Sequence, residues 1–402
     1  MQKKLTLKQK MIRFIKRNKK KTGRQVPAAL VAMLVLALLL SIAERPVTAR
    51  FEREPGAALV VTMVGDMMFD RHVQTAVDRY GYESLFQYVK PLFLASDYNT
   101  GNFEQPVVLD DGYAKAPHEI NFKTDAAAVK ILKEMNFTTM NLANNHMLDY
   151  GEAALRDTLA AFEQEGVAVV GAGVDLDEAM RVDYRTINGV KIATLGFTDI
   201  YPLNSMLDQA KDDPALTGYT AAAGRAGVLT AKPYRIAPLI QRARHNADLV
   251  IVHMHWGHEY NSTITAQERD LARTMVDLGA DIIIGHHPHV LKPVEIYNGS
   301  VIFYSLGNFI FDQGFSRTKM SAVAQYKLFD DGSARVEITP LSIREAHPRP
   351  LNPILQWGFG LKIRRILTKD LPDGAARIED GGKIVISLGE AVRQKEKEIE
   401  AN

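Results

Sequence analysis

Short apolar runs that end in clusters of polar residues recur along this chain, and they constrain its fold more than any other feature. The run at residues 59–64 ends at Asp66, and the run at 137–140 ends in the stretch NLANNHMLDYG at 141–151. Each run has the length and composition of a buried strand, and helix-like spacing of apolar residues follows several of them. The alternation predicts an α/β or α+β domain, in which strand ends open into a ligand-binding crevice.

Six such strand ends supply carboxylate, amide and imidazole groups. Six of the eleven histidines fall within residues 253–289, and the chain has no cysteine, so a metal ion would be held by nitrogen and oxygen ligands. This inventory suits two divalent cations of the Mn, Zn or Fe type, among which the sequence does not discriminate. The six clusters are Asp66; Asn102 and Glu104; Asn145 and His146; His253 and His255; His287 and His289; and Asn308.

Each cluster also has a structural explanation. Asn and Asp favour turns and helix caps for local hydrogen-bonding reasons, so the 141–151 stretch alone is equally consistent with a turn. His253 and His255 share one face of a strand, which is compatible with a core position as well as with a ligand. The sequence GHHPH at 285–289 favours metal ligation, because three histidines in four residues repel one another when protonated.

The N-terminal region predicts a membrane anchor. Residues 1–24 carry eleven Lys or Arg and no acid, which leaves 38 basic against 47 acidic residues in the remainder. Residues 26–43 are uncharged and apolar, and a helix of that length reaches about 27 Å, close to the thickness of a bilayer core. The positive-inside rule places the basic arm in the cytoplasm and the main domain outside the cell. A cleaved signal peptide ending near residue 49 is the alternative.

We therefore predict five segments and expect no nucleic-acid partner, because the basic arm directly precedes the apolar run. The segments are a basic cytoplasmic arm at 1–25, a single transmembrane helix at 26–43, a linker at 44–57, a main domain at 58–345 and a C-terminal appendage at 346–402.

Six motifs in order resemble the capsule-biosynthesis protein CapA family, which is associated with poly-γ-glutamate. They are GDMMFDR (65–71), GNFEQPV (101–107), NLANNHMLDYG (141–151), HWGHEY (255–260), GADIIIGHHPHVLKPVE (279–295) and YSLGNFIFDQ (304–313). That family is similar to the calcineurin-like metallophosphoesterases. The resemblance implies a four-layer α/β/β/α sandwich for the main domain.

The resemblance also implies roles for individual residues. Asp66 would be the first metal carboxylate, Glu104 would bridge the metals with Asn102 beside it, Asn145 would bind a metal, and His146 would be the general acid. The remaining metal ligands would be His255, His287 and His289. Further candidates are Asn102, His253, His286, Glu259 and Asn308.

This chain departs from the metallophosphoesterase pattern at two positions. Met68 stands where a histidine ligand is usual, and Glu104 stands where an aspartate is usual. Thioether sulfur is a poor ligand for a hard cation, so one of the two metals is expected to bind weakly or not at all. The register of the GHHPH motif leaves His286 as an alternative to His287.

Three functions are compatible with the sequence. The first is an extracytoplasmic metal-dependent hydrolase that acts on a phosphoester or a related envelope substrate. The second is a non-hydrolytic component of a capsule machine, anchored near polymer synthase and export subunits. The third is a binding module whose basic arm holds anionic lipid or a cytoplasmic partner; it explains the arm but not the histidines.

Overall fold

The computed structural model describes residues 6–19, 21–117, 119–200 and 218–389. Parts of the predicted basic arm (1–5 and 20) and of the predicted C-terminal appendage (390–402) lie outside these residues. The chain divides into two compact units, Met1–Pro46 and Val47–Asn402.

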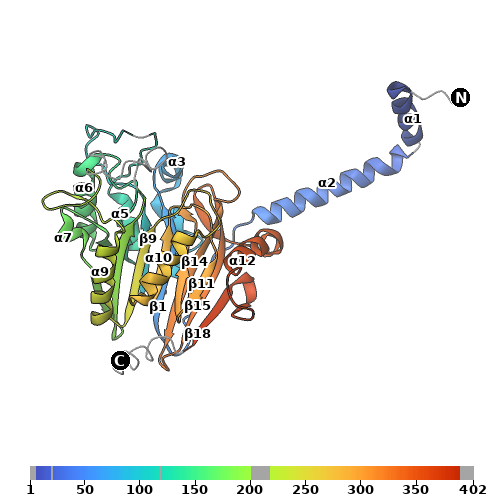
Figure 1. The fold of residues 1–402 in the computed structure, drawn as a ribbon. Coiled ribbons are helices and arrows are strands. Elements are labelled where there is room, and N and C mark those ends of the chain that lie inside the picture. The colour runs from blue at the N-terminus through green and yellow to red at the C-terminus, as the bar shows by residue number, and fades with distance from the viewer. Residues whose placement is uncertain (1–5, 20, 118, 201–217, 390–402) are drawn as a thin grey trace. The chain divides into compact units, whose positions relative to one another are not determined.

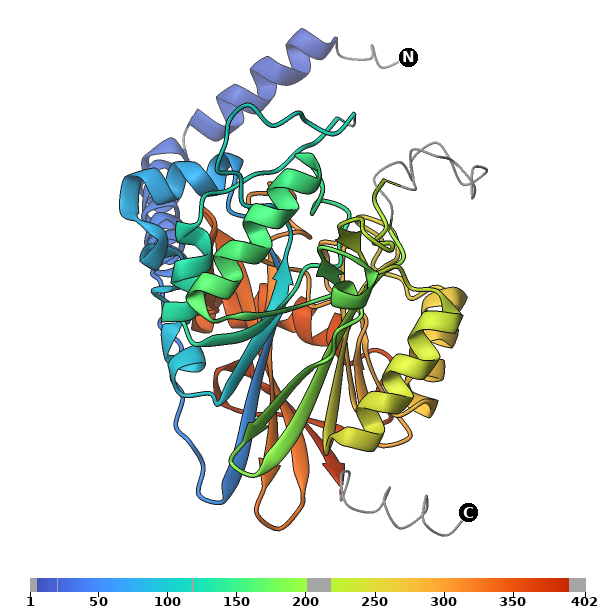
Figure 2. The same cartoon turned by 90° about the vertical axis from the view of Figure 1, so that its left-hand side faces the viewer.

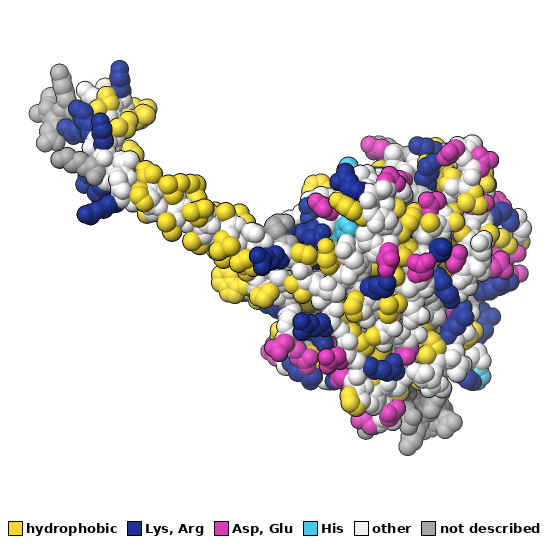
Figure 3. Space-filling view, turned by 180° about the vertical axis from the view of Figure 1, so that it is seen from behind, with side chains coloured by type: hydrophobic (Ala, Val, Ile, Leu, Met, Phe, Trp, Pro, Cys, Tyr) yellow, Lys and Arg dark blue, Asp and Glu magenta, His cyan; other side chains and the backbone are white. Residues whose placement is uncertain are grey.

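The N-terminal unit consists of helices α1 (Leu7–Lys19) and α2 (Thr22–Glu44). Within α2, the segment Thr22–Ile42 is long and apolar enough to cross a membrane, and none of it is buried by the rest of the chain. Apolar side chains cover the face of this helix seen in Figure 3. Pro27 lies in its second turn, close to the N-terminal end where proline is best tolerated. The apolar helix is therefore present, and it begins four residues before the predicted span.

The main unit contains a large mixed sheet. Among the described residues it has ten strands, in the order β17-β18-β15-β14-β1-β2-β3-β4, with β13 paired to β1 and β16 paired to β15. Strands β13, β1, β2, β3 and β4 are mutually parallel. The strands are β1 (Ala57–Met67), β2 (Tyr98–Phe103), β3 (Phe137–Asn141), β4 (Ala168–Val170), β13 (Asn308–Ile310), β14 (Met320–Phe329), β15 (Ala334–Arg344), β16 (His347–Pro350), β17 (Ala376–Ile378) and β18 (Ile384–Gly389).

A second sheet has six strands among the described residues, in the order β11-β12-β10-β9-β7-β6. Its central strands β7, β9, β10 and β12 are parallel. The strands are β6 (Asp183–Ile187), β7 (Val190–Thr198), β9 (Leu249–His255), β10 (Ile282–His286), β11 (Val294–Tyr297) and β12 (Ser300–Phe303); a small ladder joins β5 (Ala172–Gly173) and β8 (Gly227–Val228).

Three apolar clusters stack these elements into layers. One cluster lies between the two sheets, where Val61 of β1 and Ile251 of β9 are fully buried. A second lies between the large sheet and α3 (Arg71–Tyr80), η1 (Tyr82–Phe86), α4 (Lys90–Leu94), α5 (Ala127–Glu134) and α6 (Gly151–Glu165). The third lies between the six-stranded sheet and α7 (Leu176–Ala179), α9 (Pro233–Asn246) and α10 (Ala266–Asp277).

The sheets therefore lie face to face with helices outside each of them, as Figure 1 and Figure 2 show. The predicted four-layer α/β/β/α architecture is confirmed. Strand residues alternate between the layers: in β9, Leu249 and Ile251 face the other sheet, and Val250 and Val252 face the helices. By the same alternation His253 and His255 face the space between the sheets.

Residues after 346 extend the large sheet through β16, β17 and β18. Between these strands lie α11 (Pro353–Leu355), η2 (Gln356–Gly360), α12 (Leu361–Leu367) and η3 (Asp380–Gly382). Ile363 and Leu367 of α12 are fully buried in the cluster between the sheets. This C-terminal stretch thus shares the core of the main unit.

Candidate metal centre between the two sheets

Two buried carboxylates come from the large sheet. Asp66 lies near the end of β1 and Glu104 directly follows β2, and both side chains are fully buried. Gly65 makes this geometry accessible, since a Cβ there would lie 1.8 Å from the carbonyl oxygen of Gly307. The close approach allows Asp66 to pair in register with Asn308 of β13.

Three imidazoles come from the six-stranded sheet. His255 is the last residue of β9, and His287 and His289 follow β10 directly. His287 has φ of 89° and His289 has φ of 54°, the left-handed region that non-glycine residues rarely adopt. Such backbone conformations persist where the surroundings impose them, and they concentrate at functional sites.

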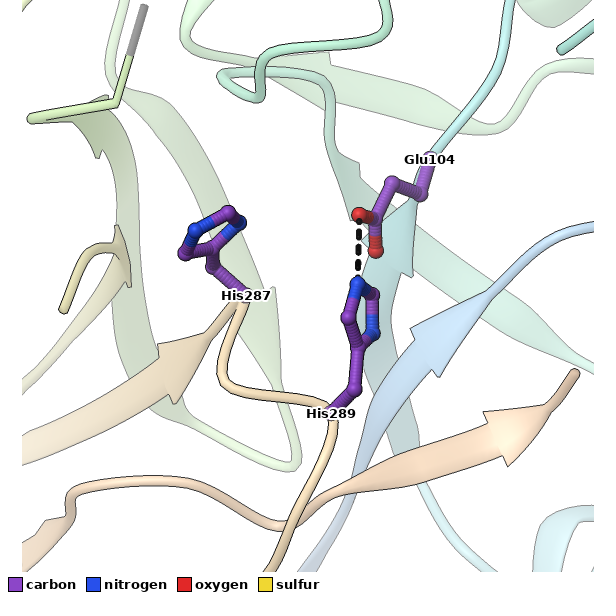
Figure 4. A group of neighbouring side chains, drawn as sticks. All are labelled: Glu104, His287 and His289. Carbon is purple, nitrogen blue, oxygen red and sulfur yellow. Dashed lines mark ion pairs between the residues drawn. The ribbon is translucent and has the colours of Figure 1, made fainter. Parts of the chain in front are cut away.

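These five side chains form two groups that share one member. The ligand atoms of Glu104, His287 and His289 lie within 4.8 Å of one another, and so do those of Asp66, Glu104 and His255. Figure 4 shows Glu104 and His289 pointing toward each other, with His287 beside them; Glu104 Oε1 and His289 Nε2 are 3.6 Å apart. A carboxylate common to two ligand groups is the arrangement that a bridged pair of metal ions requires.

Unsatisfied polar atoms support this fit. Within the described residues, Glu104 Oε1 and His287 Nδ1 are buried and have no hydrogen-bond partner. A buried polar atom without a partner is costly, typically by about 1–3 kcal/mol. Carboxylate and neutral imidazole are ligands for Mn, Fe and Zn, so a divalent ion would satisfy both atoms at once.

The two carboxylates differ in their electrostatic surroundings. Burial alone would raise the pKa of Asp66, but the close approach of the His286 and His289 rings holds that pKa well below its usual range. For Glu104, burial and then the nearby negative charge of Asp66 raise the pKa well above its usual range. Without a cation the centre thus holds one ionised carboxylate and one that favours a proton.

The pKa values of the imidazoles are also shifted in opposite directions. Burial and the charge of neighbouring histidines lower the pKa of His255 and of His287 well below the usual value, so both rings are neutral. Burial also opposes the charged form of His289, but its hydrogen bond to Asp66 and the surrounding carboxylates raise its pKa. Neutral rings can offer a lone pair to a metal ion without first losing a proton.

Asn102 holds the two carboxylates rather than pointing its oxygen at the centre. Its Nδ2 donates to Asp66 Oδ1 at 2.9 Å and to Glu104 Oε2 at 3.2 Å. Its Oδ1 accepts from Asn141 Nδ2 at 2.9 Å and from Asn144 Nδ2 at 3.3 Å. The amide orientation makes Asn102 a positioning residue for both acids.

Asn145 and His146 belong to the 141–151 motif and lie near the centre. Asn145 Oδ1 lies 2.7 Å from His255 Nε2, so it is in reach of the centre. His146 is nearly buried, and its Nδ1 lies 2.8 Å from Asp149 Oδ2. That contact fixes the orientation of the ring. His146 also lines the mouth described below.

The remaining candidates take supporting or peripheral positions. His253 is sandwiched between Thr100 Oγ1, 2.7 Å from its Nε2, and His286 Nε2, 3.0 Å from its Nδ1. His286 Nδ1 in turn lies 3.2 Å from Asp66 Oδ1, although not in hydrogen-bond geometry. Asn308 Oδ1 lies 2.9 Å from His289 Nδ1. Glu259 is exposed at the rim.

A cavity of about 640 Å³ leads to the centre and reaches His146 and His289. Its walls include Phe122 and Tyr260. Arg71 lies over the Phe122 ring, 4.7 Å from the centroid, and forms an ion pair with Asp312.

Sequence reasoning did not assign the polar residues that hold the candidate ligands. Asn141, Asn144 and Asp149 lie in the same 141–151 motif as Asn145 and His146, so the motif itself was the available signal. Which residue of such a motif supports and which one faces the ligand depends on side-chain orientation. Arg71 and Asp312 lie in the motifs at 65–71 and 304–313, but their pairing is visible only in the folded chain.

Comparison with known proteins gives a consistent result. The model of the family described as bacterial capsule synthesis protein PGA_cap matches residues 60–313. The PGA biosynthesis protein CapA of Bacillus subtilis (strain 168) is 42% identical over 401 residues, which cover 99% of this chain and 100% of that protein. The capsule biosynthesis protein CapA of Bacillus anthracis is 40% identical over 395 residues, covering 96% of this chain and 92% of the relative.

More distant similarity extends to other bacteria. A probable polyglutamine synthesis accessory protein of Mycobacterium tuberculosis (strain CDC 1551 / Oshkosh) is 28% identical over 225 residues, covering 54% of this chain and 56% of that protein. Among solved structures, TT1561 of Thermus thermophilus aligns with 66% of this chain and 93% of its own at 12% identity and a TM-score of 0.38. That score is too low to support a functional argument.

Proposed function

The chain belongs to the bacterial capsule synthesis protein PGA_cap family, and from this premise we propose that it is a membrane-anchored component of poly-γ-glutamate capsule biosynthesis with a metal-dependent hydrolytic centre. The observation that carries the proposal is the pair of ligand groups that share Glu104. The partners are the cytoplasmic membrane, the capsule polymer and the synthase or export subunits that make and move it.

The anchor is α2, and the main domain faces outside the cell. The arm before α2 carries eleven basic residues within positions 1–24 and no acid. Basic segments next to a transmembrane helix stay on the cytoplasmic side, which places Val47 and all that follows on the other side. Electrostatic attraction of each Lys or Arg to the anionic membrane surface, about 1 kcal/mol per residue, strengthens the anchoring.

The centre would hold one divalent ion between Asp66, Glu104 and His255 and another between Glu104, His287 and His289. When bound, such a pair would lower the pKa of a bound water and would neutralise charge on the oxygens of a scissile bond. The chain's own residues do the rest. Asn102 orients both carboxylates, and His146, held by Asp149, donates a proton to the leaving group.

A turnover assay with a histidine variant tests the hydrolytic part. Full-length protein in detergent, loaded with Mn²⁺, is expected to hydrolyse a chromogenic phosphodiester or phosphomonoester. His146→Ala is expected to lower kcat by roughly 10²–10⁴-fold without changing metal content, because it removes a proton donor and no proposed ligand. His245→Ala, an exposed histidine of α9, is the matched control and should keep parental turnover. Metal-dependent turnover that survives His146→Ala would contradict the assigned role.

A non-hydrolytic role in the same machine is the second candidate. It is favoured by the relatives' names, which describe biosynthesis or an accessory to synthesis rather than hydrolysis. A glutamate polymer also contains no phosphate. A strain that carries only Glu104→Ala distinguishes the two: loss of surface polymer supports a working metal centre, and parental polymer levels support a scaffold.

A further inference from the structure

A second cavity, of about 770 Å³, lies along the outer edge of the six-stranded sheet. Its walls come from α7, the edge strand β6, the start of β7 and the last turns of α9. These elements lie together on the side of α9 seen in Figure 2. Lys191 of β7 is at the amino end of that strand, whereas the metal centre is at the carboxyl ends of the parallel strands. The groove is therefore separate from the mouth of the centre.

The groove is basic, and part of its charge is uncompensated. Arg181, Arg185, Lys191 and Arg242 line it, against one lining acid, Asp177. In the part of the chain that the structure describes, the side chains of Lys191 and Arg242 form no ion pair. These cations therefore keep their charge available to a ligand from solution.

The other two cations are paired to different degrees. Arg181 approaches Glu178 at 3.4 Å but remains 74% exposed, and an ion pair so open to water contributes little. Arg185 is held by Asp183, with contacts of 3.0 and 3.1 Å from its Nε to the two carboxylate oxygens. Arg181 can thus turn to a new anion, and Arg185 helps to shape the wall.

A basic groove is unexpected on this domain. Outside residues 1–24 the chain has 38 basic and 47 acidic residues, so the bulk of it repels an acidic polymer. A local concentration of cations in a concave site is the feature that would let such a domain hold one.

We propose that this groove binds a segment of a carboxylate-bearing polymer, namely the poly-γ-glutamate of the proposed function, on which this inference rests. Lys191, Arg242 and Arg181 attract the side carboxylates. Thr186 and Asn246, which also line the groove, offer polar groups to the amide links of such a polymer, and Tyr184, 43% exposed, offers a flat apolar face to its methylenes. The groove holds the polymer at a distance from the metal centre and leaves that centre open.

Binding of fluorescently labelled poly-γ-glutamate to the full-length protein in non-ionic detergent tests the proposal. Fluorescence anisotropy at low salt is expected to show that Lys191→Glu combined with Arg242→Glu weakens affinity about tenfold or more, since two attractions become repulsions. Lys130→Glu combined with Lys133→Glu, two exposed lysines of α5, makes the same change of charge elsewhere and should have a much smaller effect.

Three further measurements make the result decisive. Arg13→Glu combined with Arg17→Glu in α1 measures how much the basic arm itself attracts the polymer. The proposal is overturned if the groove variant binds like the parent, if either control pair loses as much, or if labelled polyphosphate of matched charge binds the groove more tightly. Metal content of the same samples separates this outcome from failure of the metal centre, because the groove variants leave every proposed ligand in place.

Discussion

The two sheets contribute opposite chemistry to the centre between them. The ten-stranded sheet supplies acids and the amide that orients them, Asp66, Glu104 and Asn102, whereas the six-stranded sheet supplies imidazoles. Neither set could bind a pair of cations well alone: the acids repel each other, and the histidines supply no negative charge to balance that of the cations. The comparison shows that the face-to-face packing of the sheets, rather than either motif, creates the site.

Within this contrast Glu104 is the residue common to both ligand groups, so its loss should have the largest effect. Glu104→Gln keeps the shape of the side chain but removes the charge that both groups share. We expect metal binding to fall by more than the roughly 10–100-fold typical of losing an outer partner of a ligand. Elemental mass spectrometry of the metal-loaded protein measures this. Parental metal content in the variant would show that Glu104 is not a shared ligand.

Removing an imidazole should affect one half of the centre only. His255→Ala alters the group with Asp66 and Glu104, and His287→Ala alters the group with Glu104 and His289. Each variant is expected to retain about one metal ion per chain, because the other group remains complete. Metal titrations followed by native mass spectrometry count the ions. A variant that loses all metal would indicate a single site.

A smaller effect is expected from the positioning amide. Asn102→Ala removes hydrogen bonds to both acids while leaving every proposed ligand in place. Metal affinity should fall by about 10–100-fold, with the number of ions at saturation unchanged. Isothermal titration of the variant beside the parent checks both quantities. A lower number at saturation would mean that Asn102 itself binds a metal.

The smallest effect on stability is expected from His253, whose ring contacts His286 on the six-stranded sheet. Burial and the charge of His286 lower its pKa well below 6.5 in the folded chain. As pH falls below about 6.5, the unfolded chain binds a proton that the folded chain does not, so the metal-free protein loses stability.

His253→Gln removes this contribution to the pH dependence. Between pH 6.5 and 5.5 the metal-free variant should lose about 1 kcal/mol less stability than the metal-free parent, which corresponds to one proton over most of that interval. Urea unfolding at the two pH values measures the difference. An equal loss in both proteins would show that His253 is protonated in the folded state.

The sequence predicted the individual strands well because their signal is local, whereas the four-layer arrangement was implied by the family resemblance. Buried strands such as β9 and β10 are short continuous apolar runs, and the apolar segment of α2 is unmistakable in length and composition. The C-terminal strands were harder to predict. β16 and β17 have four and three residues and carry Pro or Arg, so their periodicity is weak, and they are strands because β15 and β18 pair with them.

The centre was predictable in composition but not in orientation. Motif spacing alone indicated which strand ends carry ligands, and the structure brings Asp66, Glu104, His255, His287 and His289 together. Motif spacing could not indicate that the Asn102 amide turns its nitrogen toward the acids, or that the His286 ring contacts His253. Such choices depend on hydrogen bonds between segments that are far apart in the sequence.

Electron paramagnetic resonance of the full-length protein loaded with Mn²⁺ tests the shared-ligand centre most directly. Two ions bridged by Glu104 would be roughly 3.5–4 Å apart and magnetically coupled, so we expect the spectrum of an exchange-coupled pair, lost in Glu104→Gln. A six-line spectrum of isolated Mn²⁺ at full loading would contradict the account.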